Sequence, residues 1–397
     1  MAATARAMQL GDVIRFGNGK AIKPGGEGCY PVYGSNGIIG GCDEFRYENG
    51  VIIGRVGAYC GSVAYCPDKF WASDNTLVAF PASNEFDTKF LFYLLHDTKL
   101  SRYAGGAAQP LVTQTVLKQV KVSVPPLPVQ RRIAGILSAY DELMENSQRR
   151  IRILEAMGRA LYREWFVHFR FPGHEKHPRV ASPVGNIPQG WEVKPLSSII
   201  NVIHGYAFQG SHFSDEPTSR VLTTPGNFRA GGGIKYDKLK FYSEEGPLES
   251  AYVFEPMDLM VTMTDLSKAG DTLGFPAFVP KLNGLSFLHN QRIGRVVPLG
   301  EFLPKHFLYC VFCDERYRHH IVGGATGMSV KHTSPTRILN YTLALPKDGK
   351  LIHAFEDFAR PVFQQTNCLI EGVENLRRTR DLLLPRLLSG QVALITA

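Results

Sequence analysis

The residues of this sequence best suited to metal chemistry are two cysteines followed by two histidines. Cys310 and Cys313 form a C-x-x-C pair, and His319 and His320 come shortly after it. Thiolates and imidazoles at such spacing can hold zinc in a tetrahedral site. Structural zinc sites usually combine two such pairs or use separated histidines, whereas these histidines are adjacent. We therefore predict small buried thiols at this place and no metal site.

Motifs that would carry catalysis are incomplete wherever they begin. Gly54, Gly57 and Gly61 lack the following Lys-Ser or Lys-Thr of a phosphate-binding loop, so turn glycines are the favoured interpretation. Glu192–Lys194 has the E-x-K spacing of a metal-dependent nuclease, but no aspartate occurs in the preceding 30 residues. Val124–Leu127 (VPPL) has the prolines of an amino-methyltransferase motif without its polar and aromatic residues. The sequence therefore predicts no catalytic residue.

Basic and amide side chains offer a different chemistry, the binding of double-stranded DNA. The formal net charge of +8 favours a polyanionic partner. Arginine and lysine bind phosphates and guanines, while asparagine and glutamine bind adenines. We predict DNA contacts from loops of two globular regions. In the first half these are Lys20, Lys23, Ser35, Asn36, Arg55, Tyr59, Lys69 and Gln109. In the second half they are Gln209, Arg220, Asn227, Arg229, Lys268, Asn290, Arg292 and Lys331.

Length and cysteine content indicate the class of protein and its compartment. A chain of 397 residues exceeds what one hydrophobic core usually supports, so two domains are expected. Seven irregularly spaced cysteines are typical of reduced thiols in the cytosol. The N-terminal Met1–Leu10 lacks the apolar run of a secretory signal, and no run reaches the about 18 residues of a membrane span. We expect a cytoplasmic protein.

The chain repeats one order of parts in its two halves. Each half has short apolar runs with glycine turns, then a strand ending at a proline, then a long helical segment. The matching segments are Leu10–Ile22 with Leu196–Phe208, Lys89–Leu95 with Lys305–Val311, Gly105-Gly106 with Gly323-Gly324, and Val122–Pro125 with Leu343–Pro346.

Both helical segments carry apolar residues at seven-residue spacing, as in a coiled coil. At 1.5 Å per residue the first, Gln130–Phe166, would be about 55 Å long, which is long for a helix that merely covers a core. Two equivalent units can pair such helices about a pseudo-two-fold axis only if they run antiparallel. The predicted helix–helix interface comprises Ile133, Ile136, Tyr140, Leu143, Ser147, Ile151 and Leu154 with Ile352, Phe355, Val362, Thr366, Leu369, Val373 and Leu376.

Five residues predict local features of these helices. Ser147 and Thr366 place a hydroxyl at the middle of each series, where it can fix the register between helices. Pro361 predicts a kink or a break near residue 358. Arg380 occupies an interface position and is expected to extend toward solvent. Gly390 marks the end of the second helix.

Several short segments, taken in their order and spacing, resemble the specificity subunits of type I restriction-modification systems. The resemblance covers essentially the whole chain, although each segment alone is weak. The last of them, Arg380–Val392 (RDLLLPRLLSGQV), is the most specific. The others are YPVYGSNGIIG at Tyr30–Gly40, VIIGRVG at Val51–Gly57, FWASDN at Phe70–Asn75, QRRIAGIL at Gln130–Leu137, LYREWF at Leu161–Phe166 and IPQGW at Ile187–Trp191.

The resemblance implies a non-catalytic, DNA-binding subunit that recognises a bipartite, asymmetric sequence. It implies an α+β fold with two mixed α/β target-recognition domains separated by two long antiparallel helices. The expected ranges are 1–125 and 173–346 for the domains, and 126–172 and 347–397 for the helical spacers. The expected partners, besides DNA, are two modification (methyltransferase) subunits and restriction or translocase subunits. S-adenosylmethionine, ATP and magnesium would bind those partners, and the complex would be a site-specific endonuclease and adenine methyltransferase.

Two alternatives stay open from the residues alone. A self-contained DNA methyltransferase or nuclease with unfamiliar motifs would turn over DNA without partner chains. A coiled-coil protein scaffold would show no salt-dependent affinity for DNA.

Overall fold

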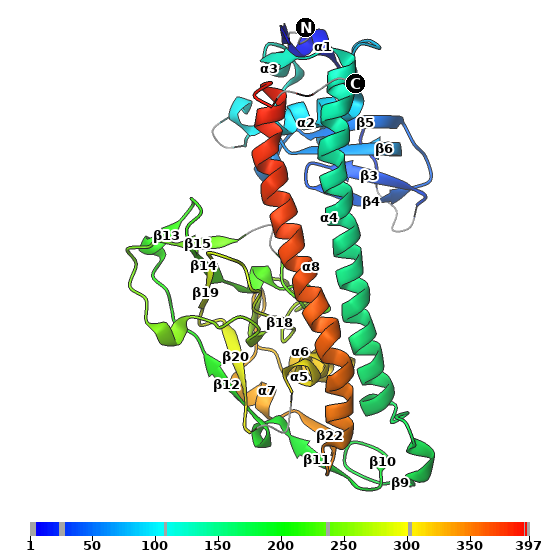
Figure 1. The fold of residues 1–397 in the computed structure, drawn as a ribbon, viewed down its shortest axis with the longest axis vertical. Coiled ribbons are helices and arrows are strands. Elements are labelled where there is room, and N and C mark those ends of the chain that lie inside the picture. The colour runs from blue at the N-terminus through cyan, green and yellow to red at the C-terminus, as the bar shows by residue number, and fades with distance from the viewer. Residues whose placement is uncertain are drawn as a thin grey trace. The chain divides into compact units, whose positions relative to one another are not determined.

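The computed structural model describes residues 5–23, 28–106, 109–235, 239–300, 304–392 and 394. Contacts divide the chain into two compact units. Unit 1 comprises Met1–Glu145 with Glu374–Ala397, and unit 2 comprises Asn146–Val373. Both boundaries fall inside the two longest helices, α4 (Leu127–Tyr162) and α8 (Lys350–Leu388), which Figure 1 labels. Each unit therefore contains one part of each long helix.

A six-stranded sheet in the order β2-β7-β5-β6-β3-β4 forms the centre of unit 1. Figure 1 labels four of its strands, β5, β6, β3 and β4. Its side chains alternate between two faces, as the two-residue period of a strand requires. Val51 and Ile53 of β5 share a core cluster with Phe90 of α2, whereas Ile52 belongs to a second cluster. The elements before α4 are β1 (Arg6–Gln9), α1 (Leu10–Val13), β2 (Ile14–Asn18), β3 (Tyr30–Gly34), β4 (Gly37–Cys42), β5 (Tyr47–Gly54), β6 (Val63–Ala72), β7 (Thr76–Pro81), α2 (Thr88–Asp97), α3 (Gln114–Lys118) and β8 (Lys121–Val124).

Unit 2 contains two four-stranded sheets, in the orders β12-β20-β16-β18 and β13-β15-β14-β19. Its largest core cluster joins Tyr162 of α4, Phe307 of α5 and Phe355 of α8. The elements are β9 (Arg179–Val180), β10 (Ile187–Pro188), β11 (Trp191–Pro195), β12 (Ile200–His204), β13 (Phe213–Ser214), β14 (Arg220–Thr223), β15 (Lys240–Tyr242), β16 (Leu259–Thr262), β17 (Thr264–Asp265), β18 (Pro276–Phe278), β19 (Ser286–His289), β20 (Ile293–Pro298), α5 (Lys305–Cys313), α6 (Glu315–Gly323), β21 (Lys331–His332), α7 (Pro335–Leu339) and β22 (Thr342–Pro346).

The two units share a framework of elements in the same order, although unit 2 has additional strands, and this confirms the predicted internal repeat and the α+β class. An early strand pairs antiparallel with the last strand in each unit: β1 with β8 in unit 1, and β11, the third strand of unit 2, with β22. The short helix before each closing strand is capped in the same way. The Thr113 hydroxyl accepts from Val116 N at α3, and the Ser334 hydroxyl accepts from Arg337 N at α7. Each closing strand then leads into a long helix.

One detail of the predicted repeat is wrong. Gly105 and Thr326, not Gly105 and Gly323, occupy equivalent places, because each forms an antiparallel bridge with the residue six positions later. The residues that follow them, Gly106 and Gly327, have left-handed φ angles of 94° and 91°. The left-handed glycine after each bridge residue therefore aligns the two halves, with Gly106 opposite Gly327. The similarity of Gly105-Gly106 to Gly323-Gly324 in the sequence is coincidental.

In unit 1, α4 and α8 run antiparallel and are joined by a charged pair. Asp141 Oδ1 lies 2.6 Å from Arg380 Nη1, and residues 133–137 of α4 share a core cluster with residues 384–388 of α8. The Tyr93 hydroxyl of α2 donates to Asp141 Oδ2 at 2.5 Å. Arg380 thus pairs across the helices, which corrects the expectation that it extends toward solvent.

In unit 2, the two helices are also antiparallel. A Cβ on Gly158 would lie 3.3 Å from Cε2 of Phe363, and one turn further along α4 the Tyr162 ring contacts Phe355. The helix continues through Pro361, so the predicted break does not occur. Proline forfeits one backbone hydrogen bond, but Phe355 and Phe363 on either side of it are buried in the core of unit 2 and hold the helix together.

Burial follows most of the predicted helix interface. Six of its residues are buried and seven are half-buried. Leu143 is the exception, because it is 55% exposed while Met144 beside it is buried. A helix has 3.6 residues per turn, so a strict seven-residue series drifts off the covered face, and we correct the interface residue to Met144. The Thr366 hydroxyl donates to the Val362 carbonyl of its own helix at 3.0 Å, so this bond does not fix register between helices.

We predict that Asp141→Ala destabilises unit 1 by about 1.5 to 3 kcal/mol, because Arg380 and the Tyr93 hydroxyl both lose a charged partner. Urea denaturation measures this change. The neighbouring Glu142→Ala, which removes only an exposed ion pair with Lys89, serves as control and should change stability by less than about 0.5 kcal/mol. Equal effects of the two substitutions would contradict the role given to Asp141.

Candidate nucleic-acid interface

The turn between β6 and β7, Ala72–Thr76 (turn 1), collects three loops of unit 1. Its Ala72 carbonyl accepts from Lys20 N at 2.8 Å, and its Asn75 carbonyl accepts from Arg55 N at 2.9 Å. The Ser35 hydroxyl donates to the same Asn75 carbonyl at 2.7 Å. Through these hydrogen bonds to its carbonyls, turn 1 fixes the segments that carry Lys20, Ser35 and Arg55.

Three more of the predicted DNA-contact residues lie in segments joined to turn 1. Asn36 is exposed and follows Ser35 in the β3–β4 connection. Tyr59 is exposed at the end of the short helical turn that follows Arg55. Gln109 is also exposed, and its segment is joined to this helical turn by a hydrogen bond from Gly57 N to the Pro110 carbonyl at 3.1 Å. The structure therefore gathers six of the eight predicted residues of the first half.

The other two lie elsewhere. Lys69 places its Nζ 4.4 Å from the centre of the Phe45 ring, and Lys23 is exposed beyond Lys20. Arg55 has the environment best suited to a ligand. It is half-buried, and its Nε has no hydrogen-bond partner among the residues that the structure describes.

The turn before β20, His289–Ile293 (turn 2), does in unit 2 what turn 1 does in unit 1. The His289 carbonyl accepts from Tyr206 N at 2.8 Å, and the Arg292 carbonyl accepts from Met263 N at 2.9 Å. The parallel strand pairs also correspond, Thr223 with His289 and Tyr33 with Ala72. Turn 2 is thus the equivalent of turn 1, and it carries the exposed Arg292.

Two further cations of the second half lie in loops linked to turn 2. Lys331 pairs in register with Asp265. Two residues later, Thr333 donates its N–H to the carbonyl of Met263, the residue whose N–H binds the Arg292 carbonyl, and this hydrogen bond is 2.9 Å long. Lys268 is exposed in the loop that begins at Asp265. Gln209 is exposed as well, three residues after Tyr206.

Asp265 shapes the loop that presents Lys268. Its Oδ1 accepts from Ser267 N at 2.7 Å, and its Oδ2 accepts from both the N–H and the hydroxyl of Thr272. Desolvation by burial opposes ionisation here, but these hydrogen bonds lower the pKa of Asp265 below its usual value. The carboxylate is therefore charged at neutral pH and holds the two ends of the loop together.

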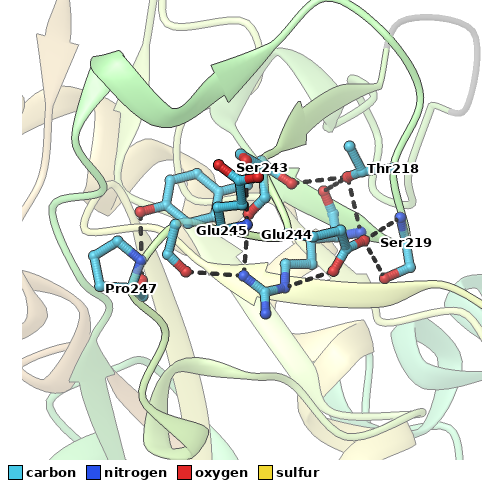
Figure 2. Close-up of polar contacts among 9 residues, drawn as sticks. Thr218, Ser219, Ser243, Glu244, Glu245 and Pro247 are labelled. Atoms are coloured by element: carbon cyan, nitrogen blue, oxygen red, sulfur yellow. Dashed lines mark hydrogen bonds and ion pairs between the residues drawn. The ribbon is translucent and has the colours of Figure 1, made fainter.

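Arg220, a predicted DNA contact, uses its guanidinium to hold the loop after β15. Nη1 donates to the Ser243 carbonyl at 3.0 Å and the Gly246 carbonyl at 2.9 Å, and Nε lies 3.1 Å from Glu244 Oε2. Figure 2 shows the same loop, in which Glu244 also accepts from the N–H and hydroxyl of Ser219. The hydrogen bond from the Ser219 hydroxyl is the main cause of a lowered pKa of Glu244.

Arg229 is likewise engaged within unit 2. Its Nη2 lies 2.7 Å from Oε1 of Glu155, a buried carboxylate on α4, and Arg159 lies 4.0 Å from the other carboxylate oxygen. Burial raises the pKa of Glu155, and the two arginines oppose that shift. The pair ties the segment around Arg229 to the long helix.

Asn227 and Asn290 are both buried. The Asn227 amide oxygen accepts from the N–H and hydroxyl of Thr224, and the Asn290 amide oxygen accepts from Arg292 N at 3.0 Å. These two side chains, like those of Arg220 and Arg229, make contacts within unit 2 that hold its loops in place. We therefore withdraw all four from the predicted DNA contacts.

The two cysteines pack in the core of unit 2, whereas His319 is exposed. Burial raises the pKa of the Cys310 thiol, and it raises that of Cys313 to about 12. Within the described ranges, no group of three or more histidine, cysteine, aspartate or glutamate side chains is placed to hold a metal ion. Nor does any described helix have the length and apolarity needed to cross a membrane.

Sequence reasoning missed the turn backbones themselves. Phe70–Asn75 (FWASDN) and Phe287–Arg292 (FLHNQR) occupy equivalent places, and each begins with a phenylalanine buried in its unit. This shared phenylalanine followed by a polar turn is the signal that could have identified turn 2.

We predict that Arg220→Ala lowers the stability of unit 2 by about 1 to 2 kcal/mol and speeds amide hydrogen exchange in residues 243–247, because two carbonyls lose their donor. Hydrogen-exchange mass spectrometry gives the local change, with the exposed Lys240→Ala as control. Unchanged exchange combined with a loss of DNA affinity would restore Arg220 as a DNA contact.

Comparisons with known proteins find similar chains. Residues 5–156 match a family model described as the type I restriction modification DNA specificity domain. The chain is 24% identical over 327 residues to the type I restriction enzyme MjaIX specificity subunit of Methanocaldococcus jannaschii, covering 77% of this chain and 69% of that protein. It is also 24% identical over 364 residues to the MjaVIII specificity subunit of the same organism, covering 85% of this chain and 81% of that one.

A solved structure shares the fold. The S subunit of a type I restriction-modification system from M. genitalium aligns with a TM-score of 0.57 at 16% identity, over 97% of this chain and 96% of that one. Residues 5–156 therefore match a type I restriction modification DNA specificity domain, and along most of its length the chain is similar to type I restriction-modification specificity subunits.

Proposed function

We propose that this chain recognises a bipartite, asymmetric DNA sequence, with one half-site bound at turn 1 and the other at turn 2. The observation that supports this most directly is the equivalence of the two turns. Each turn gathers the loops of its own unit. Lys20 and Arg55, which are exposed or have an unpaired nitrogen, lie on loops bonded to turn 1, and the exposed Arg292 lies in turn 2 itself. The loops around the turns differ in sequence, so the two half-sites would differ too.

The chemistry of these side chains suits base and phosphate recognition. An arginine binds the O6 and N7 atoms of guanine with two hydrogen bonds, which suits Arg55 and Arg292. The lysines Lys20, Lys268 and Lys331 suit phosphates, which position a protein on DNA without reading its sequence. We retain the predicted contacts except the four side chains that are engaged inside unit 2.

The long helices would act as spacer and docking surface. In this proposal the ranges 1–125 and 173–346 recognise DNA, and 126–172 and 347–397 set the distance between half-sites. The chain itself is non-catalytic, and the modification and restriction subunits supply methylation and cleavage with their S-adenosylmethionine, ATP and magnesium. Both alternatives have a plain signature: turnover of DNA by the isolated chain for an enzyme, and absence of salt-dependent DNA affinity for a scaffold.

Methylome sequencing of the source cells, with and without this gene, tests the proposal as a whole. The expected result is one bipartite motif that is methylated only when the gene is present. A motif without a central gap, or no change in methylation, would contradict it.

We predict that Arg55→Ala and Arg292→Ala each weaken binding by about 1 to 3 kcal/mol and relax the preference at a single guanine. Fluorescence anisotropy with a duplex carrying the methylated motif measures the affinity. Lys281→Ala is a suitable control. Lys281 is exposed and follows β18, whose C-terminal end lies at the far end of the sheet from turn 2. Affinities equal to that of the control would remove both arginines from the interface.

We also predict that lengthening both helices changes the gap in the motif. Four residues inserted after Gln148 and four after Gly372, on the facing part of α8, add about 6 Å, or about two base pairs. Selection from duplexes with variable gaps gives the preferred spacing. Single substitutions at the same positions are the controls, and an unchanged gap in the lengthened chain would contradict the spacer role.

A further inference from the structure

The most exposed apolar side chains of the described residues gather at the two turns. Met328 is 92% exposed, Leu266 63% and Ile38 62%, more than any other large hydrophobic residue that the structure describes. Leu266 follows Asp265 in the loop that carries Lys268, and Ile38 follows the Ser35–Asn36 connection at turn 1. Single exposed apolar residues are common on protein surfaces, but the three most exposed ones lie on loops linked to turn 1 or turn 2, which indicates a role for these loops.

Met328 stands at the tip of a closed loop. Thr326 and His332 close it with two backbone hydrogen bonds, of 3.0 and 2.9 Å. Gly327 has a φ of 91°, and a Cβ there would lie 2.0 Å from the Val330 carbonyl, so the turn needs glycine. The backbone that presents Met328 is therefore fixed by its own hydrogen bonds.

Cations accompany this exposed tip. Lys331 belongs to the same loop and pairs in register with Asp265, and Thr333 joins the loop to Met263, which is bonded to Arg292 of turn 2. An apolar tip set among cations is complementary to the surface of a DNA groove. Phosphates attract the cations, while thymine methyl groups and base faces are the apolar surfaces within the groove.

We propose that Met328 is a specificity-determining residue that contacts bases of the half-site at turn 2 through its apolar side chain. This inference rests on the proposed function, because it assumes that turn 2 meets DNA. It adds to the polar contacts a type of recognition that sequence reasoning, which searched for cations and amides, did not consider.

Selection from a random-sequence duplex library tests the proposal, with the full chain used alone and with its modification subunits. Wild type and Met328→Leu are expected to select the same motif. Met328→Ala should lose preference at one or two adjacent positions of one half-site only, with binding weaker by about fivefold or more. Leu299→Ala is the matched control, because Leu299 is 55% exposed but follows the end of β20 remote from turn 2.

The possible failures are distinct. If Met328→Ala selects the wild-type motif with unchanged affinity, Met328 does not read bases, although turn 2 can still do so. Loss of assembly with partner chains at an unchanged motif would also overturn the proposal, since Met328 would then contact protein. If wild type selects no motif at all, the proposed function and this inference both fail.

Discussion

The pairing of a few turn carbonyls determines what both globular regions can present to a ligand. In unit 1 the carbonyls of Ala72 and Asn75 accept hydrogen bonds from loops that are distant in sequence, and in unit 2 those of His289 and Arg292 do the same. These bonds use backbone atoms, so they hold for any loop sequence that keeps the local geometry. Side chains on the loops are thereby free to differ, and a fold of this kind can keep its frame while its surface chemistry changes.

Charged pairs inside each unit connect the globular part to the long helices. In unit 1, Tyr93 and Arg380 meet at Asp141 of α4. In unit 2, Arg229 meets Glu155 of the same helix. The pairs use different residues in the two units, although both place a carboxylate of α4 at the junction. Partly buried pairs of this kind are costly to break singly, so they favour one orientation of the helix within its unit.

Sequence reasoning predicted the repeat, the two long helices and their antiparallel pairing, because apolar periodicity and proline punctuation are local signals. It failed where tertiary contacts decide. Pro361 does not break α8, since core packing on both sides outweighs one lost hydrogen bond. Arg220 and Arg292 are indistinguishable by residue type. Arg220 nevertheless binds two carbonyls and a carboxylate, whereas Arg292 is exposed. No sequence pattern shows which acceptors will reach an arginine, so residue type alone could not separate structural from binding side chains.

Photo-cross-linking gives the most direct measurement of the central claim that turns 1 and 2 face DNA. A duplex with the motif and with 5-iododeoxyuridine at successive positions would be irradiated with the full chain, and the linked peptides identified by mass spectrometry. Our account predicts cross-links to the segments around residues 35–36 and 55–59 from one half-site, and around 266–268, 290–292 and 326–332 from the other. Cross-links confined to other surfaces, or both half-sites linking to one unit, would contradict it.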